Sequence, residues 1–245
     1  MARYFGNDDA NRYAGTSVAD LIYGRSGDDR LSGGGGNDTI EGGEGNDQIR
    51  GGSGNNIIRG GGGNDRIWAD GGSDRIDAGE GNDLVSAGAG HNHIALGEGN
   101  DRARALGGND RIDSGEGDDT VHSGGGSDRI WGRDGGDILL AEAGDDILSG
   151  GEGDDVLNGG IGNDVMAGGE GADRFVFNGG IDRITDYDDG DDRIDVSAFS
   201  GFTGFGSIRN AASQAGDDVV LRAGSHRLVI EDTRLSQLGG DDFIW

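Results

Sequence analysis

The feature that most constrains this chain is a nine-residue period that runs from Gly27 to Phe175 without a slip of register. Aspartate stands in fifteen of the seventeen units, with glycine always two residues before it and an apolar side chain always two residues after it. Asn56 and Asn92 take the place of aspartate in the other two units. Because one nine-residue unit cannot bury an apolar face by itself, this period predicts a solenoid in which each unit contacts mainly its neighbours.

Each unit reads as a glycine-rich turn followed by a short strand. Residues 42–50, with the sequence Gly-Gly-Glu-Gly-Asn-Asp-Gln-Ile-Arg, are representative. The frequent glycines exclude helices from this part of the chain. We expect a three-residue strand whose central side chain points inward and whose two flanking side chains point outward. The predicted fold class is all-β, with a thin core of one aliphatic side chain per unit.

The composition indicates that the chain depends on cations. Forty-seven acidic residues face twenty basic residues, all of them arginine, and the formal charge is −27. Nucleic acid is an unfavourable partner because its phosphates would be repelled. Hydrophobic residues make up only 32% of the chain, against 56 glycines whose ordering costs entropy. We therefore expect the metal-free chain to stay unfolded until cations neutralise it.

Several functional classes are disfavoured by what the sequence lacks. There is no cysteine, so any metal must be held by oxygen ligands. No apolar run has the length of a membrane span, and the first residues lack the apolar core of a signal peptide. No H-E-x-x-H or G-x-S-x-G motif is present, and we expect no enzymatic activity.

The repeat matches the pattern G-G-x-G-x-D-x-U-x, and the chain therefore resembles the RTX family of calcium-binding proteins over about residues 15–245. The resemblance implies a right-handed parallel β-roll in which two units form one coil and residues eighteen apart stack. It also implies multiple calcium ions, each held between successive coils of one edge by aspartate carboxylates and backbone carbonyls. Calcium takes roughly six to eight oxygen ligands, and this donor set suits it.

Stacking by eighteen sorts the expected calcium ligands onto two edges. The first edge carries Asp29, Asp47, Asp65, Asp83, Asp101, Asp119, Asp137, Asp155 and Asp173. The second edge carries Asp20, Asp38, Asn56, Asp74, Asn92, Asp110, Asp128, Asp146 and Asp164. The resemblance adds backbone carbonyls of turn glycines such as Gly33, Gly42, Gly45, Gly60, Gly63, Gly150, Gly153, Gly159 and Gly162. Since Asn56 and Asn92 remove charge, we expect weaker calcium sites around them.

The first glycine of the unit is replaced through the middle of the array. The replacements are Ala69, Ala78, Ala87, Leu96, Ala105, Ser114 and Ser123. If this position requires a positive φ, these residues are strained and calcium is held less tightly there.

Some outward positions carry unexpected residues. Beyond residue 137 they become apolar, at Ile138, Leu140, Ile147, Val156, Val165 and Val176. We expect the C-terminal segment to cover them, with a partner protein or a membrane as the alternatives. Trp68 and Trp131 fall on opposite sheets and either stack on sugar rings or are isolated exposed aromatics. His91 and His93 flank Asn92, but their spacing on a turn makes a zinc site unfavourable.

We divide the chain into an N-terminal cap (1–19), an RTX β-roll (20–176) and a C-terminal cap with the signal region (177–245). The ending, Asp241-Asp242-Phe243-Ile244-Trp245, resembles the uncleaved signal of RTX proteins exported by type I systems. The resemblance implies a stand-alone hemolysin-type calcium-binding repeat protein, secreted from a Gram-negative bacterium through a type I exporter.

We expect this protein to act as a structural or binding module that folds on calcium outside the cell and contacts a cell surface or polysaccharide. The alternatives are the folding and secretion module of a larger exoprotein, or a membrane-active RTX protein. An ice binder would need outward ladders of Thr and Asn, which the outward positions do not provide.

Overall fold

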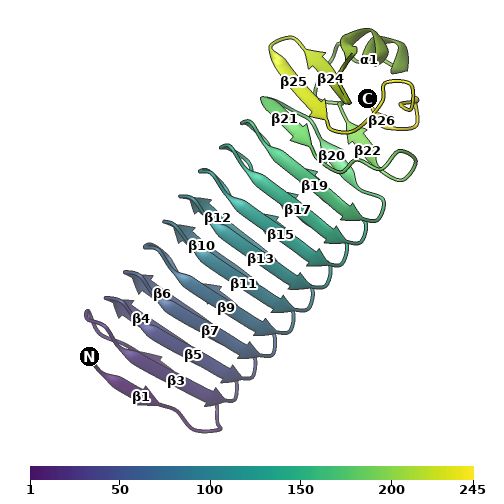
Figure 1. The fold of residues 1–245 in the computed structure, drawn as a ribbon. Helices are drawn as coiled ribbons and strands as arrows, with labels where there is room; N and C mark the ends of the chain where they lie inside the picture. The colour runs from purple at the N-terminus through teal and green to yellow at the C-terminus, as the bar shows by residue number, and fades with distance from the viewer.

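The computed structural model describes all 245 residues as a long parallel β-solenoid, with the N-terminus at one end of the rod and the C-terminal segment at the other (Figure 1). Sheet 1 contains, in spatial order, β1 (Arg3–Phe5), β3 (Leu21–Ser26), β5 (Thr39–Glu44), β7 (Ile57–Gly62), β9 (Arg75–Glu80), β11 (His93–Glu98), β13 (Arg111–Glu116), β15 (Arg129–Asp134), β17 (Ile147–Glu152), β19 (Val165–Glu170), β21 (Ile181–Ile184), β25 (His226–Ile230), β24 (Asp218–Ala223) and β23 (Ala212–Ala215).

Sheet 2 lies opposite and contains β2 (Arg12–Ala14), β4 (Arg30–Gly35), β6 (Gln48–Ser53), β8 (Arg66–Trp68), β10 (Leu84–Ala89), β12 (Arg102–Gly107), β14 (Thr120–His122), β16 (Ile138–Leu140), β18 (Val156–Asn158), β20 (Arg174–Val176), β22 (Arg193–Asp195) and β26 (Phe243–Ile244). One helix, α1 (Phe205–Ala211), lies in the C-terminal segment. It is the only helix, and no helix is long and apolar enough to cross a membrane.

Register between neighbouring strands confirms that two units form one coil. Ile22 pairs with Ile40 in sheet 1, and Leu31 pairs with Ile49 in sheet 2, each across eighteen residues. The predicted all-β parallel β-roll is therefore the observed architecture, and the nine-residue period records the alternation between its two sheets.

Most strands are longer than expected, and this changes the account of the core. Many strands run for six residues and point two side chains inward, so the expectation of one inward residue per unit is wrong. The second inward position is that of the first glycine in the unit. Ala69, Ala78 and Leu96 at this position are fully buried.

The predicted strain at this position is also wrong. None of the seven replacements, from Ala69 to Ser123, has a positive φ. Five of them lie within strands, and Ala69 and Ser123 directly follow the ends of β8 and β14. Positive φ falls instead on the two other glycines of the turn, such as Gly43 (113°) and Gly45 (125°). At Gly45 an added Cβ would lie 2.6 Å from the carbonyl oxygen of Gly27 in the preceding coil, so stacked turns leave no room for a side chain.

The strand ladder extends at both ends beyond the perfect sequence period. β1 pairs with β3, and β2 pairs with β4, in the same eighteen-residue register. At the other end, β21 and β22 continue the two sheets. The antiparallel strands β25, β24 and β23 then close sheet 1, and β26 closes sheet 2.

The C-terminal segment stacks on the end of the rod and does not fold back over the last coils (Figure 1). Ile138 and Ile147 are both 41% exposed, so the expectation that this segment covers them is wrong. The physical reason is that β21 and β22 add to the open backbone edges of β19 and β20, which places the whole segment along the rod axis.

Candidate calcium sites on the two edges

Each repeat aspartate is positioned by the coil that precedes it. One carboxylate oxygen, Oδ1, accepts the backbone N–H of the residue eighteen positions earlier, as in Asp29 N–H to Asp47 at 2.7 Å. The same bond recurs along both edges at 2.6–3.2 Å. All these side chains are buried, and each edge is therefore a continuous internal row as the eighteen-residue stacking predicts, all aspartate on the first edge and interrupted by Asn56 and Asn92 on the second.

The second oxygen of these carboxylates has no partner. Oδ2 is buried and unbonded in all fifteen aspartates from Asp29 to Asp173. A buried carboxylate without a compensating donor or cation costs several kcal/mol. A repeated deficit of this kind indicates a cation that the protein chain does not itself supply.

The first glycine of the unit forms part of the space around this oxygen. A Cβ at Gly42 would collide with Oδ2 of Asp47 and would lie 2.6 Å from the carbonyl oxygen of Gly60 in the next coil. The equivalent arrangement occurs at Gly33, Gly60 and Gly150, and at Gly159 the Asp164 carboxylate fills the same space. Carboxylate and carbonyl oxygens thus converge without a hydrogen-bond donor between them.

Among the predicted turn glycines, Gly45, Gly63 and Gly153 have positive φ, whereas Gly162 does not. No three side chains of the usual metal-binding types converge at one point. Backbone carbonyls would therefore have to supply much of the ligand set, which suits calcium because it accepts carbonyl oxygens as readily as carboxylates.

Asn56 and Asn92 show which hydrogen bonds form in this space when asparagine stands in place of aspartate. The Asn56 side-chain Nδ2 donates to the carbonyl oxygen of Gly54 at 3.0 Å, and that of Asn92 donates to Gly90 at 3.1 Å. The amide N–H groups make bonds that no aspartate can make, since an ionised carboxylate has no proton to donate. In these two units the asparagine amide thus donates a hydrogen bond to a carbonyl oxygen of its own turn. This is consistent with the expectation of weaker calcium sites around them.

The ends of the rows differ from the sequence-based expectation. Oδ2 of Asp20 accepts hydrogen bonds from the backbone N–H and the hydroxyl of Thr16, so this carboxylate has no free oxygen. Asp182 and Asp192 continue the second and first rows and receive the N–H groups of Asp164 and Asp173. The prediction omitted both, although each begins an Asp-Arg-Ile triplet like those of the repeat.

The histidines and tryptophans lie outside these rows. His91 Nδ1 accepts the N–H of Asn109 at 2.7 Å, and the His93 ring contacts the Arg75 guanidinium at 3.2 Å, so neither is arranged as a metal ligand. Trp131 lies under Arg111, whose guanidinium carbon is 4.3 Å from the ring centroid.

Burial dominates the protonation of the carboxylate rows. Desolvation raises the pKa of Asp65 and Asp137 to about 8, and that of Asp101 and Asp155 to about 7. At the start of the second row, by contrast, the N–H of Ala2 lowers the pKa of Asp20. Protons and metal ions thus compete for the same buried oxygens along most of each row.

We predict that acid partly replaces calcium in folding the chain. A carboxyl whose pKa is raised in the folded state binds more protons there, so the metal-free fold is most stable below the ordinary value near 3.8 and loses stability as pH rises towards 8. Calcium-stripped protein should gain β-structure in circular dichroism as pH falls from 8 to 5. Identical spectra at both values would contradict this prediction.

A second prediction concerns Asn56→Asp. This change adds one unpaired buried carboxylate, so it should destabilise the metal-free fold and stabilise the calcium-loaded one, by about 2.7 kcal/mol where free calcium is 100 times the dissociation constant of the new site. Asn55→Asp is the matched control, because it adds the same charge to an exposed neighbour in the same turn. Thermal midpoints with and without calcium give the measurement. Equal effects of the two variants would rule out a site at residue 56.

Comparison with known proteins agrees with this geometry. The model of the RTX calcium-binding nonapeptide repeat, in four copies, matches residues 5–40, 32–67, 41–76, 59–94, 68–103, 97–130, 131–166 and 149–184. These stretches together span residues 5–184, which is more than half of the chain. A search of curated proteins finds no match.

Three solved structures are similar. The extracellular lipase LipA from Serratia marcescens has 19% identity and a TM-score of 0.36, over 81% of this chain and 40% of the lipase. The AlgE6R3 subunit of the Azotobacter vinelandii mannuronan C5-epimerase has 27% identity and a TM-score of 0.35, over 57% of this chain and 81% of that one. A hyperactive, Ca²⁺-dependent, β-helical antifreeze protein from an Antarctic bacterium has 18% identity and a TM-score of 0.40, over 92% and 95%.

This chain thus spans about 40% of the length of the lipase that it matches. The family assignment depends on the repeat model, whose matches follow one another through both sheets and along both rows of buried carboxylates. The chain belongs to the RTX calcium-binding nonapeptide repeat family, and its cofactor is calcium, bound at multiple sites.

Proposed function

We propose that this chain is a secreted RTX protein that folds when it binds many calcium ions outside the cell and then acts as a rigid structural or binding module. The observation that carries the proposal is the set of fifteen buried aspartates whose Oδ2 atoms have no partner. These aspartates, from Asp29 to Asp173, would hold the ions together with carbonyl oxygens of the glycine turns.

The energetic argument is that the fold is incomplete without a cation. The core between the sheets is thin, and its narrowest unit contributes only Ala103 and Ala105. Against this, the chain must bring rows of carboxylates together while carrying a formal charge of −27. Where calcium is scarce, as in cytosol, repulsion and desolvation favour the unfolded chain. Outside the cell, calcium reverses the balance.

The role we propose for the β-roll is structural rather than catalytic. Its outward side chains are regularly spaced because the coil repeats, and the buried carboxylates lie along the two edges as the expected calcium ligands. Export through a type I system, with the signal at the C-terminus, is part of the same proposal and would deliver the unfolded chain to calcium.

We predict that calcium drives folding. Metal-free protein at pH 8 should give a disordered far-ultraviolet circular dichroism spectrum, and millimolar calcium should convert it to a β-rich spectrum. The reason is that each independent site adds about 2.7 kcal/mol when free calcium is 100 times its dissociation constant. Magnesium is the control, since it requires a smaller octahedral site. Persistence of the β-rich spectrum in excess chelator at pH 8 would sink the proposal.

The export signal requires a separate test, because β26 is also the last strand of sheet 2. The N–H of Ile194 donates to the carbonyl oxygen of Asp242 at 2.8 Å, so deleting residues 241–245 would disturb folding as well as export. Asp241 and Trp245 are exposed, and changing only these two to Ala leaves β26 in place.

We predict that Asp241→Ala with Trp245→Ala greatly reduces secretion from a host with a type I exporter while calcium-driven folding stays unchanged. Asp217→Ala with Leu106→Ala is the control, because it also removes one exposed carboxylate and one exposed apolar side chain. Equal amounts of both variants in the medium would argue against a signal at the C-terminus.

A further inference from the structure

One face of the rod has a charge opposite to that of the whole chain. The first two outward positions of each sheet 2 strand from β2 to β12 are Arg12, Ala14, Arg30, Ser32, Gln48, Arg50, Arg66, Trp68, Leu84, Ser86, Arg102 and Arg104. None of these is acidic, although the chain has 47 acidic residues. Six of them are arginines, all exposed, and we call the surface formed by these twelve positions the arginine face.

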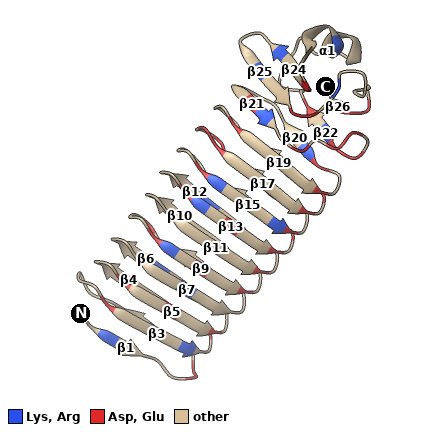
Figure 2. Cartoon of the chain, in the orientation of Figure 1, with Lys and Arg blue, Asp and Glu red and all other residues tan.

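Most guanidinium groups of the arginine face have no ion-pair partner. Only Arg50 forms one, with Nε 3.9 Å from Asp70 Oδ2, and both side chains are more than half exposed. Sheet 1 is arranged differently, because acidic residues such as Asp77 and Asp113 lie among its outward arginines. Figure 2 shows acidic residues concentrated along the turns, whereas arginines lie on the strands.

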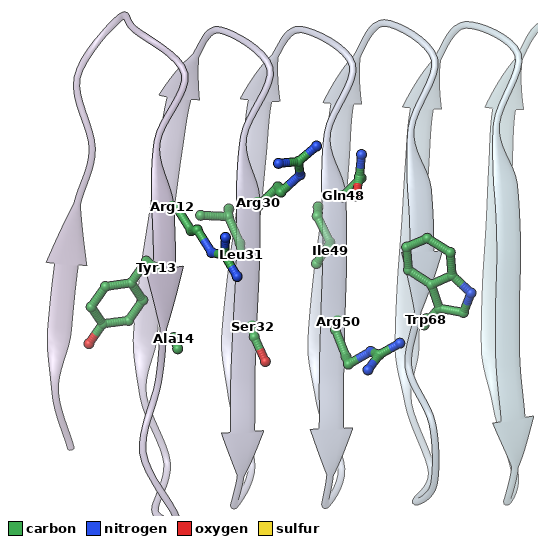
Figure 3. A pocket seen from close by; sticks show the side chains of 10 residues that line it. All are labelled: Arg12, Tyr13, Ala14, Arg30, Leu31, Ser32, Gln48, Ile49, Arg50 and Trp68. Atoms are coloured by element: carbon green, nitrogen blue, oxygen red, sulfur yellow. The ribbon is translucent and has the colours of Figure 1, made fainter.

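The arginine face contains a hollow of roughly 340 Å³ that crosses strands β2, β4, β6 and β8. Its polar lining includes Arg12, Arg30, Ser32, Gln48 and Arg50. Trp68 lies at its far end beside Arg50, whose guanidinium carbon is 5.9 Å from the ring centroid (Figure 3). The corresponding distance at Trp131 is 4.3 Å, so the arginine lies farther from the ring at Trp68 than at Trp131.

Calcium controls how strongly this face attracts anions. The carboxylates of the first edge adjoin it, since Asp29 precedes Arg30 and Asp65 precedes Arg66. Each bound ion adds two positive charges, so about thirteen ions would offset the formal charge of −27. The arginines then dominate the local field, because charges farther away than about one Debye length are screened.

Resting on the proposed function, we infer that the calcium-loaded arginine face binds an extended anionic polysaccharide. From β2 to β12 the face spans five strand steps of about 4.8 Å, roughly 24 Å, and is two side-chain columns wide. That shape suits a single extended chain. Arginine recognises carboxylate or sulfate groups through paired N–H donors, Ser32, Gln48 and Ser86 can bond sugar hydroxyls, and Trp68 offers an apolar surface for one sugar ring.

Other anionic partners fit this face less well. Single-stranded nucleic acid is normally bound by several aromatic side chains that stack on successive bases, and this face has one tryptophan. A lipid surface would require a cluster of apolar side chains that enter it, and the only large aliphatic residues that these strands expose are Leu84 and, near the end of β12, Leu106.

The test uses the full chain in calcium, with dextran sulfate as the probe and uncharged dextran as the control polymer. The variant Arg30→Gln/Arg66→Gln/Arg102→Gln removes three charges from the arginine face. The variant Arg75→Gln/Arg111→Gln/Arg129→Gln removes three charges from the same repeat position on sheet 1. Titration calorimetry at two salt concentrations measures binding, and circular dichroism with calcium checks folding.

We expect the wild type to bind dextran sulfate, more weakly at higher salt, and not to bind dextran. The sheet 2 triple variant should bind at least about tenfold more weakly, and the sheet 1 variant less than twofold more weakly. Trp68→Ala should weaken binding several-fold, and Trp131→Ala should have little effect. Equal losses in the two triple variants, or no binding by the calcium-folded wild type, would overturn the inference.

Two further results separate this inference from the proposed function. Tighter binding of a 20-nucleotide thymidine oligomer than of dextran sulfate would assign the face to nucleic acid and overturn the polysaccharide. If the chain is already β-rich without calcium, the proposed function fails, whereas the comparison of the two triple variants still decides where the polysaccharide binds.

Discussion

This structure depends on the carboxylate of each repeat, whose two oxygens have different roles. Oδ1 accepts an N–H from the preceding coil and so holds two coils together, whereas Oδ2 stays buried and unpaired beside carbonyl oxygens. One side chain therefore stabilises the stack of coils and also leaves a buried negative charge that a cation must compensate. A cation bound to these oxygens stabilises every coil that it contacts. Metal binding is therefore coupled directly to the ordering of the backbone.

Much of the fold could be predicted from the sequence because the period has no slip. The eighteen-residue stacking, the two sheets and the two carboxylate rows all follow from one coil of two units, and the pairing of Ile22 with Ile40 confirms it. The second inward column could not be read, because glycine shows no side-chain direction. Buried side chains that replace this glycine, such as Ala69 and Leu96, reveal which way that position points.

The remaining departures arise where tertiary context outweighs the local pattern. Asp192 follows Asp173 by nineteen residues, so a count by eighteen misses it even though the hydrogen bond is the same. Apolar side chains such as Ile138 suggested a cover, but the open backbone edge of the last coil was the stronger determinant of where the C-terminal segment packs. The weaker calcium site expected at Asn56 stays a prediction, and the sequence did not show that its amide would donate a hydrogen bond to Gly54.

The two-unit coil also limits how such a chain can change its length. Removing eighteen residues deletes one coil and leaves every later strand in its own sheet. Removing nine residues would move each later strand to the opposite sheet, so that Arg66 and Trp68, for example, would leave the face that carries Arg30 and join the one that carries Asp77. Insertions and deletions during evolution are therefore expected to be tolerated in pairs of repeats, because a single repeat exchanges the two surfaces beyond it.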